Sequence, residues 1–373
     1  MKAFHLIPSV AEYAEFADFA REAQLGENDL ILTNEYIYNP AIARLELGCQ
    51  TLFQEQYGAG EPSDVMVDAI LDALRGKRYG RIIAVGGGTI IDIAKVLAVA
   101  GAEDTVDDLY GRMASLTKVH PLVIVPTTCG TGSEVTNISI INRTRMGVKL
   151  GLVSPSMFAD EAALIPGMLA SLPYGVFATS SIDAMIHAVE SYLSPNACAI
   201  SALFSERALT LILRGWKAAV QAGGKDGWKP HAAAFLRASN FAGIAFGHAG
   251  CAAVHALSYP LGSVHHIPHG QANQLMFADV MRKYQEKKPI GRLNELEELL
   301  AAELGVEPVF ALEALYQLMD RVLERRPLRE HGVTDEELPT FAHNVVESQQ
   351  RLLGNNYVPL SEDEILEIYR KAF

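Results

Sequence analysis

Five of the chain's eleven histidines fall within one short segment, GHAGCAAVHALSYPLGSVHHIPHG at residues 247–270. The segment is otherwise rich in glycine and alanine, so its imidazole nitrogens lie in apolar surroundings, which suit metal binding better than solvation. Upstream, Asp183 and His187 stand four residues apart in a stretch with helical periodicity, which places a carboxylate and an imidazole one turn apart on one helix face. Together with His255 and His269 they form a set of four candidate metal ligands.

Each of these histidines taken alone could equally be a core residue with a satisfied hydrogen bond. The combination favours a metal, because one carboxylate and three imidazoles suit a divalent first-row ion such as Fe(II) or Zn(II). The four cysteines, at positions 49, 129, 198 and 251, form no CxxC pair, which argues against a closed structural zinc site and a disulfide framework. Scattered cysteines of this kind are typical of a reducing cytoplasm.

Two loops of small residues follow apolar strands and could hold a ligand. Gly86, Gly87 and Gly88 come after RIIAV and before a helix predicted over residues 89–98, so that backbone amides and a helix N-terminus can bind a diphosphate. The second loop, PTTCGTGSE at residues 126–134, offers the hydroxyls of Thr127, Thr128, Thr131 and Ser133. Two such loops in one sheet predict a ligand crevice, although both could be ordinary turns. Asp92 and Lys95, one turn apart on the following helix, could equally be a surface ion pair.

The elements that must position these residues divide the chain in two. A length of 373 residues exceeds the usual limit for one hydrophobic core, and residues 1–174 alternate short apolar runs with helical stretches, as in a parallel sheet wrapped by helices. There we expect strands over 29–33, 81–85 and 121–125, a helix over 63–74 with Ser63 as N-cap, and a β-hairpin attached to the sheet with its turn at 143–147. Residues 175–373 show helical periodicity, so the predicted fold class is an α/β domain followed by an all-helical domain.

Composition disfavours several kinds of partner. The formal net charge is −13 and Lys/Arg runs do not exceed short pairs, which disfavours nucleic acid and anionic membranes. The N-terminal segment has no apolar run of signal-peptide length, and the most apolar long run, residues 241–262, is interrupted by histidines and a proline. We therefore expect a cytoplasmic protein with a small-molecule partner and no membrane association.

Four segments, taken in order, resemble the iron-containing alcohol dehydrogenases: GGGTIIDIAK at 86–95, PTTCGTGSEVTN at 126–137, SSIDAMIHAVESYLS at 180–194 and HALSYPLGSVHHIPHGQAN at 255–273. The resemblance implies a dinucleotide-binding domain over 1–174, a helical metal- and substrate-binding domain over 175–373, and hydride transfer between NAD(P) and a small primary alcohol or aldehyde. It assigns one divalent metal, Fe(II) with Zn(II) as the alternative, to Asp183, His187, His255 and His269. A homodimer or larger oligomer is also implied.

The candidate cofactor contacts lie in the two loops and at three further positions; they are Asn34, Gly86, Gly87, Gly88, Asp92, Thr127, Thr128, Thr131, Ser133 and Lys149. Lys149 falls where members of the family place a lysine near the cofactor. Asn34 stands where many members carry an aspartate that favours NAD by repelling a 2′-phosphate. Because asparagine lacks that charge, we expect NAD, with NADP as the alternative.

The source of the transferred proton is open between two residues. Many members of the family have a histidine four residues after the third ligand, whereas this chain has Tyr259. An unperturbed phenol titrates near about 10, so Tyr259 would need the field of the metal or a relay to act near neutrality. His266 is the alternative relay, and these two are the candidate catalytic residues.

Several further segments look most like the branch of the family that interconverts 4-hydroxybutyrate and succinate semialdehyde; they are ILTNEYIYNP (31–40), FQEQYGAGEPSD (53–64), FAGIAFGHAG (241–250) and QQRLLGNNYVPLS (349–361). A substrate carboxylate requires a cation, and Arg143 or Arg351 could serve. The alternatives are a medium-chain alcohol or diol dehydrogenase of the same family, a zinc-dependent glycerol dehydrogenase type and, from another class, an inactive nucleotide-binding sensor.

Overall fold

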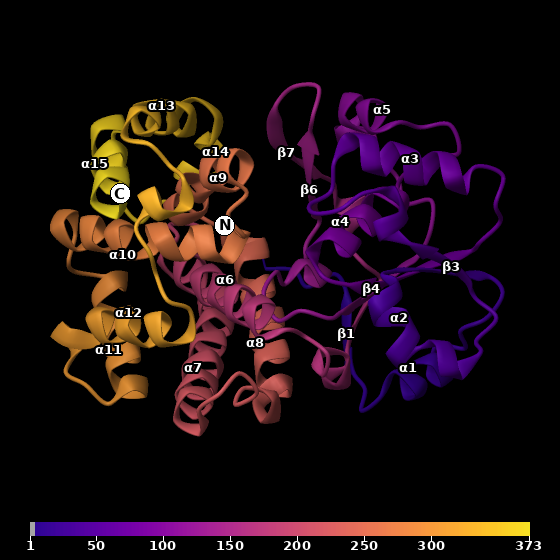
Figure 1. The fold of residues 1–373 in the computed structure, drawn as a ribbon, viewed down its shortest axis with the longest axis horizontal. Coiled ribbons are helices and arrows are strands. Elements are labelled where there is room, and N and C mark those ends of the chain that lie inside the picture. The colour runs from indigo at the N-terminus through magenta and orange to yellow at the C-terminus, as the bar shows by residue number, and fades with distance from the viewer. Residues whose placement is uncertain (1–3) are drawn as a thin grey trace. The chain divides into compact units, whose positions relative to one another are not determined.

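A computed structural model describes residues 4–373, which divide into two compact units (Figure 1). The sheet unit comprises Leu6–Leu172. The helical unit comprises Pro173–Phe373 together with Phe4 and His5. Phe4 packs against the rings of Phe204 and His248 in the helical unit.

The sheet unit is built on six parallel strands in the order β1-β8-β5-β4-β2-β3. The central strands carry runs of Ile, Leu and Val that are buried at every position, as expected for strands covered on both faces. The predictions of strands over 29–33, 81–85 and 121–125 are confirmed to within a residue or two. The strands are β1 (Ser9–Glu12), β2 (Asp29–Thr33), β3 (Gln50–Phe53), β4 (Arg81–Gly86), β5 (Leu122–Pro126) and β8 (Glu161–Leu164).

Five helices cover the two faces of this sheet. Alternate strand residues point to opposite faces, so Leu32 and Ile82 join a core with α3, α4 and α5, whereas Ile31 and Ile83 join a core with α1 and α2. As predicted, Ser63 caps α3, and its hydroxyl accepts a hydrogen bond of 3.1 Å from the amide of Met66. The helices are α1 (Phe16–Glu22), α2 (Glu35–Ala41), α3 (Asp64–Leu74), α4 (Gly88–Leu97) and α5 (Val106–Gly111).

The predicted hairpin forms, but it is not attached to the main sheet. Strands β6 (Ile138–Arg143) and β7 (Val148–Val153) pair with each other as a separate two-stranded antiparallel sheet. Strand β6 packs on α4, and two side chains of that helix satisfy its edge: Asp92 accepts from the amide of Ile140, and Lys95 donates to the carbonyl of Ile138. The prediction of attachment was wrong because side chains, rather than a neighbouring strand, pair with this edge.

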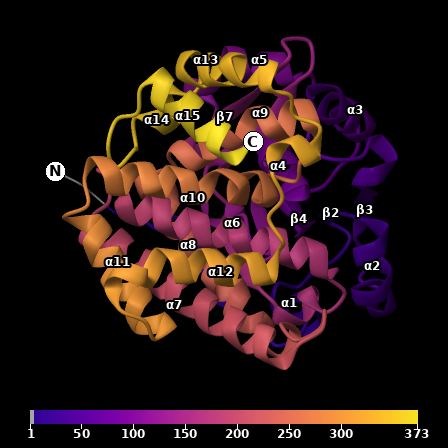
Figure 2. The ribbon, with the colours of Figure 1, turned by 60° about the vertical axis from the view of Figure 1, so that its left-hand side comes forward.

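The helical unit confirms the prediction that strand structure ends near residue 173. Within residues 173–373 every regular element is a helix, and α6 lies at the centre, packed against α7, α8 and α10 (Figure 2). The side chains of residues 181–193 are all buried, which explains the weakly amphipathic sequence of α6. The helices are α6 (Tyr174–Leu193), α7 (Ala199–Ala222), α8 (Ala232–Ala249), α9 (Ala253–His265), α10 (His269–Lys287), α11 (Arg292–Leu304), α12 (Ala311–Val322), α13 (Leu338–Ser348), α14 (Gln350–Leu353) and α15 (Glu362–Ala372).

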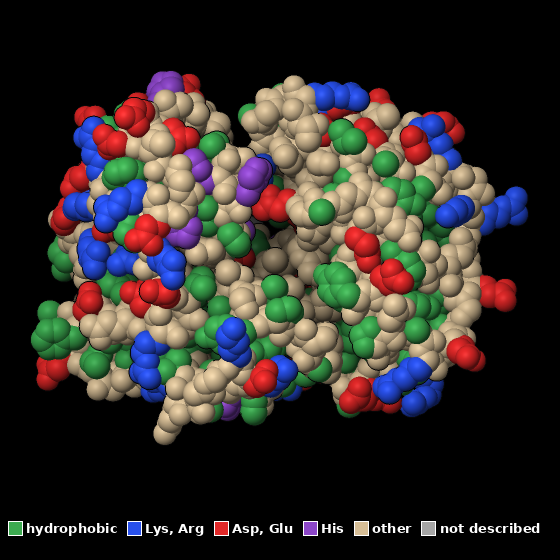
Figure 3. Space-filling model, in the orientation of Figure 1, with side chains coloured by type: hydrophobic (Ala, Val, Ile, Leu, Met, Phe, Trp, Pro, Cys, Tyr) green, Lys and Arg blue, Asp and Glu red, His purple; other side chains and the backbone are tan. Residues whose placement is uncertain are grey.

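Charged and apolar side chains are intermixed on the face of each unit that Figure 3 shows. On the face shown in Figure 3, Asp and Glu side chains alternate with Lys and Arg. Across residues 4–373 no single helix combines the length and apolar character of a membrane crossing; residues 229–249 and 253–265 meet that criterion only as a pair bent by 106°.

Candidate active site

Helix α6 carries the first two candidate ligands. Asp183 and His187 are buried one turn apart, with 3.9 Å between Oδ1 of the aspartate and Nε2 of the histidine. Burial alone would raise the pKa of the Asp183 carboxyl, but the charges of His187 and His269 and a hydrogen bond from His255 hold it well below its ordinary range. The carboxylate is therefore ionised and available as a ligand near neutral pH.

Helices α9 and α10 bring the other two candidate ligands to the same oxygen. The Oδ1 atom of Asp183 lies 3.5 Å from Nε2 of His255 and 3.6 Å from Nε2 of His269. His269 is the first residue of α10, and the rings of His187 and His255 stack with centroids 4.6 Å apart. The ligand atoms of Asp183, His255 and His269 all lie within 4.8 Å of one another, as do those of His187, Cys251 and His255. The structure thus brings all four predicted ligands together.

Glu190 orients one of these ligands, and the sequence interpretation missed it. Its buried carboxylate lies 2.6 Å from Nδ1 of His255 and accepts hydrogen bonds from the backbone amides of Ala252 (2.9 Å) and Val254 (2.6 Å). Burial lowers the pKa of His255, but the carboxylates of Glu190 and Asp183 outweigh it and raise the pKa to about 9. Glu190 accepts the proton on Nδ1, and Nε2, which faces Asp183, would become a ligand atom on losing its own proton to a bound metal. The available signal was spacing, because Glu190 follows His187 by one turn on the same helix.

Asn273 lies at the centre of the donor atoms. Its Nδ2 atom donates to Oδ1 of Asp183 at 2.8 Å and lies 3.2 Å and 3.3 Å from the Nε2 atoms of His255 and His269. Its buried Oδ1 atom has no hydrogen-bond partner among residues 4–373. One carboxylate oxygen and two ring nitrogens thus converge on the position of this amide nitrogen. With His187, the set of one oxygen and three nitrogens fits Fe(II) or Zn(II) once the histidines are deprotonated. The side chain of His269 is 38% exposed, so the cluster is open on one side.

Of the two candidate catalytic residues, only Tyr259 lies beside this cluster. It follows His255 by one turn on α9, and its ring centroid is 6.1 Å from that of His269. Burial raises the pKa of its phenol well above the ordinary value, although the nearby charge of Arg351 opposes the shift. His266 is exposed at the C-cap of α9 with a left-handed backbone (φ 55°), and among the described residues no hydrogen bond or ring contact joins it to the four ligands.

In the sheet unit, the two predicted loops lie directly side by side. Gly86 of β4 pairs with Pro126 of β5, and the carbonyl of Gly86 accepts from the amide of Thr127 at 3.0 Å. A Cβ atom on Gly87 would lie 3.0 Å from the methyl group of Thr128, and one on Gly88 would lie 3.1 Å from that of Thr131. The glycines therefore allow close packing of the loops and also leave the first amides of α4 accessible to a ligand.

Asp92 and Lys95 do not form a surface ion pair, and that alternative was wrong. Lys95 is fully buried and Asp92 is half-buried, and both contact β6 and the neighbouring loop. The ammonium of Lys95 donates to the hydroxyls of Ser133 (2.7 Å) and Thr136 (2.9 Å), and Ser133 donates in turn to Asp92 at 3.1 Å. Burial raises the pKa of Asp92 to about 6 and lowers that of Lys95 to about 8. The network fixes the loop that carries Thr127, Thr128 and Thr131.

The remaining predicted residues occupy distinct environments. Lys149 on β7 forms an ion pair with Glu61, and Asn34 is buried at the end of β2. Arg143 is buried beside Asp64 and Asp107, and its guanidinium lies 4.3 Å from the ring centroid of Tyr110. Its charge is therefore already paired within the sheet unit. Arg351 is exposed on α14 in the helical unit and makes no ion pair with any residue of 4–373. Of the two arginines considered for a substrate carboxylate, only Arg351 is available.

Comparison with known proteins identifies the family. The family model for iron-containing alcohol dehydrogenases matches residues 10–166, and the model for the C-terminal part of the Fe-containing alcohol dehydrogenase family matches residues 177–373. The chain belongs to the iron-containing alcohol dehydrogenase family. It is therefore an oxidoreductase, and the family predicted from its motifs is confirmed.

Individual members of the family match along the whole chain. The chain is 46% identical over 373 residues to 4-hydroxybutyrate dehydrogenase from Clostridium kluyveri, covering 100% of both proteins. An iron-containing alcohol dehydrogenase from Thermotoga maritima has the same fold, with a TM-score of 0.82 and 25% identity, covering 100% of this chain and 99% of that one. Sulfoacetaldehyde reductase from Bifidobacterium kashiwanohense, solved in complex with NAD+, gives a TM-score of 0.85 at 22% identity, covering 100% and 98%. The predicted fold class is thus confirmed.

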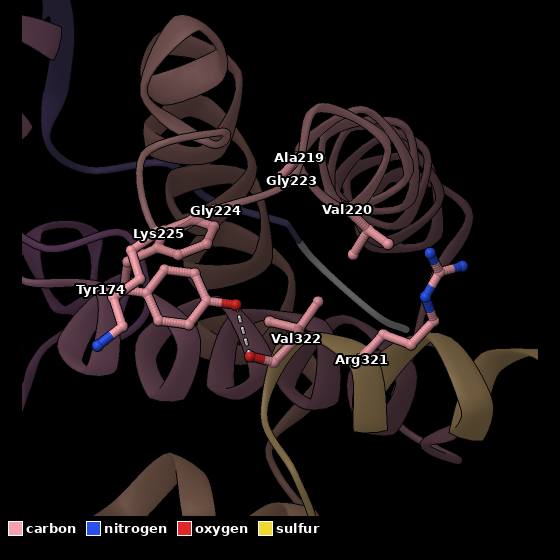
Figure 4. Close-up of a pocket in the computed structure, with 9 residues that line it drawn as sticks. Tyr174, Ala219, Val220, Gly223, Gly224, Lys225, Arg321 and Val322 are labelled. Carbon is pink, nitrogen blue, oxygen red and sulfur yellow. Dashed lines mark hydrogen bonds between the residues drawn. The ribbon is translucent and has the colours of Figure 1, made fainter.

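One cavity of this family member lies outside the candidate site. It has a volume of about 370 Å³ and lies between the start of α6, the end of α7 and the end of α12 (Figure 4). Tyr174 closes one side, where its hydroxyl donates to the carbonyl of Val322 at 2.8 Å. None of the predicted metal, cofactor or catalytic residues lines it.

Proposed function

We propose that the chain is a metal- and NAD-dependent 4-hydroxybutyrate dehydrogenase, which interconverts 4-hydroxybutyrate and succinate semialdehyde. Full-length identity of 46% to the Clostridium kluyveri enzyme is the observation that favours this substrate over others of the family. Oxidation transfers one hydride from the alcohol carbon to NAD+ and releases the hydroxyl proton; reduction of the aldehyde reverses both transfers. The clustered ligands argue against an inactive sensor.

The helical unit would hold the metal through Asp183, His187, His255 and His269. A divalent ion bound there, Fe(II) in preference to Zn(II), supplies a Lewis acid for the substrate oxygen. Glu190 would hold a proton on Nδ1 of His255 so that Nε2 faces the metal, and Asn273 would rotate or shift away from the ligand atoms that it now contacts. The open side at His269 leaves room for the substrate oxygen.

The sheet unit would hold the dinucleotide at the carboxyl ends of its strands. The first amides of α4 and the loop at 126–134 are suited to a diphosphate, with Thr127, Thr128 and Thr131 as hydroxyl partners. Bound NAD(H) supplies or accepts the hydride. Asp92, Lys95 and Ser133 act on the cofactor indirectly, because their hydrogen bonds fix the loop.

We expect Tyr259 to donate a hydrogen bond to the substrate oxygen, because its ring lies beside His269 and its raised pKa keeps the phenol protonated through neutral pH. We expect Tyr259→Phe to lower kcat about tenfold, the value of one hydrogen bond, without shifting the pH–rate profile between about pH 6 and 9. His266→Asn should leave both unchanged. A profile displaced by His266→Asn would instead identify the exposed histidine as the proton relay.

Arg351 is the residue we expect to bind the substrate carboxylate. Helix α14 packs on α9, and Asn355, one turn beyond Arg351, donates to the carbonyl of Cys251 at 2.9 Å, beside the candidate ligands. The positive charge of Arg351 also lowers the pKa values of Tyr259 and Cys251, which burial otherwise raises. The guanidinium therefore lies within electrostatic range of the position assigned to the alcohol group.

Replacing Arg351 with glutamine is expected to reduce kcat/KM for succinate semialdehyde about tenfold, because an exposed charge-assisted contact is lost, while kcat/KM for butyraldehyde stays the same. Lysine at this position should restore part of the loss. Arg370→Gln, which changes an exposed arginine on α15, is the matched control. Equal losses for both aldehydes would exclude carboxylate binding by Arg351.

Two measurements on the unmodified protein test the proposed function. Metal content is determined by mass spectrometry, and NADH oxidation is followed with succinate semialdehyde and with butyraldehyde. We expect one divalent metal per chain and a kcat/KM ratio above about ten in favour of the acid. Equal kcat/KM values would indicate a general medium-chain alcohol dehydrogenase, and absence of turnover in metal-replete protein would indicate a sensor.

A further inference from the structure

Three neighbouring parallel strands end at the same edge of the sheet. Leu32 of β2 pairs with Ala84 of β4 on one side and with Leu52 of β3 on the other. The segments that follow these strands, at Asn34, at Gly86 and at Glu55, therefore lie along one edge. In nucleotide-binding sheets an acidic side chain at the end of the strand beside the glycine loop binds the ribose hydroxyls of the adenosine.

The strand beside the glycine loop ends in an uncharged residue, but that residue holds a carboxylate from the next strand. The Nδ2 atom of Asn34 donates to Oε2 of Glu55 at 2.8 Å and to Oε1 of Gln54 at 3.1 Å. The other carboxylate oxygen of Glu55, Oε1, accepts from the backbone amide of Glu35 at 2.6 Å. Both oxygens of Glu55 are thus fixed, although the side chain itself is exposed.

The charge of Glu55 is not neutralised locally. Within residues 4–373 no lysine, arginine or histidine forms an ion pair with Glu55. Each of its oxygens retains a lone pair that can accept from a ribose hydroxyl. A 2′-phosphate at the same place would be repelled by the negative charge of the carboxylate. The backbone amide of Glu35, which could otherwise donate to a phosphate oxygen, already donates to Glu55.

We propose that Glu55, held in place by Asn34, selects the non-phosphorylated dinucleotide by accepting from the adenosine ribose and repelling a 2′-phosphate. This inference rests on the proposed function in one respect, namely that a dinucleotide binds at this edge. It assigns the selecting charge to the end of β3, whereas the sequence alone directs attention to the end of β2.

Fluorescence titration of the full chain with NADH and with NADPH tests the inference without any turnover. We expect wild-type protein to bind NADH at least about tenfold more tightly, and Glu55→Gln to tighten NADPH binding about tenfold with a much smaller change for NADH. Glu55→Asp, which keeps the charge, should retain the preference for NADH. Glu103→Gln, at an exposed site beyond the end of α4, is the matched control.

The outcomes separate the two proposals. If the wild-type protein binds neither nucleotide, the proposed function fails. If it binds both equally, or if Glu55→Gln leaves the ratio of the two dissociation constants unchanged while the melting temperature is preserved, the role of Glu55 is overturned and the dehydrogenase proposal stands. A variant with a lowered melting temperature but an unchanged ratio would assign Glu55 to capping of α2, which also overturns the inference.

Discussion

Replacing His269 with alanine is expected to abolish measurable turnover and to reduce the bound metal to a fraction of one ion per chain. His269 is one of the four proposed ligands, so its loss would leave Asp183, His187 and His255 with an incomplete coordination shell. Since loss of an outer-shell partner alone typically costs about 10–100-fold, removal of a direct ligand should exceed about 100-fold in kcat/KM. Metal content and NADH oxidation are measured on the same preparation.

His343→Ala provides the matched control for this experiment. His343 is an exposed histidine on α13 of the same unit, 3.4 Å from Glu362, and lies outside the ligand cluster. It should retain full metal content and activity. Turnover that persists in His269→Ala at the wild-type level would remove the metal site from the reaction altogether.

Replacing Glu190 with glutamine is expected to weaken metal binding by about 10–100-fold while leaving the fold intact. The carboxylate holds a proton on Nδ1 of His255, and a neutral amide can present either a donor or an acceptor to that nitrogen, so the ring loses its fixed tautomer. Metal affinity is measured by competition with a chelator. At saturating metal, kcat should recover to within a few-fold of wild type, because the residue positions a ligand and does not contact the substrate.

The matched control is Glu298→Gln, which changes an exposed glutamate on α11 that accepts a hydrogen bond from Asn294 and lies outside the ligand cluster. Unchanged metal affinity in Glu190→Gln would mean that Glu190 serves only to accept from the amides of Ala252 and Val254 at the start of α9. Nitrogen chemical shifts of the His255 ring distinguish the two roles directly, since they report which nitrogen carries the proton.

The sequence carried most of the information about the fold because the relevant signals are local. Continuous apolar runs such as DLILT and RIIAV mark strands buried on both faces, and the loss of such runs after residue 173 marks the helical unit. The hairpin at 138–153 was recognisable from its turn, but its detachment from the main sheet depends on Asp92 and Lys95, which are distant in sequence. Spacing alone could not show that these two residues turn inward.

The candidate site divides in the same way. The spacing of Asp183 and His187 places them on one helix face, and His255 and His269 lie in the family motifs. The four candidate ligands could therefore be chosen from residue type and spacing. Spacing places Glu190 one turn after His187 but does not show that it is the partner of His255. Glu190 lies 65 positions earlier and reaches Nδ1 only through the packing of α6 against the start of α9. Asn34 likewise indicates, from the sequence alone, that the end of β2 carries no negative charge. In the folded chain β3 brings the carboxylate of Glu55, 21 residues later, beside it.

The sequence by itself thus determined which residues form strands and helices, which family the chain resembles and which four side chains are the candidates for a metal site, because each depends on residue type and short-range periodicity. Only the tertiary structure decided the carboxylate partner of His255, the burial of Lys95, the ion pairs of Arg143 and the position of the charge at Glu55. These features are hydrogen bonds and ion pairs between distant segments, and their geometry exists only after the hydrophobic cores have fixed the distances between helices and strands.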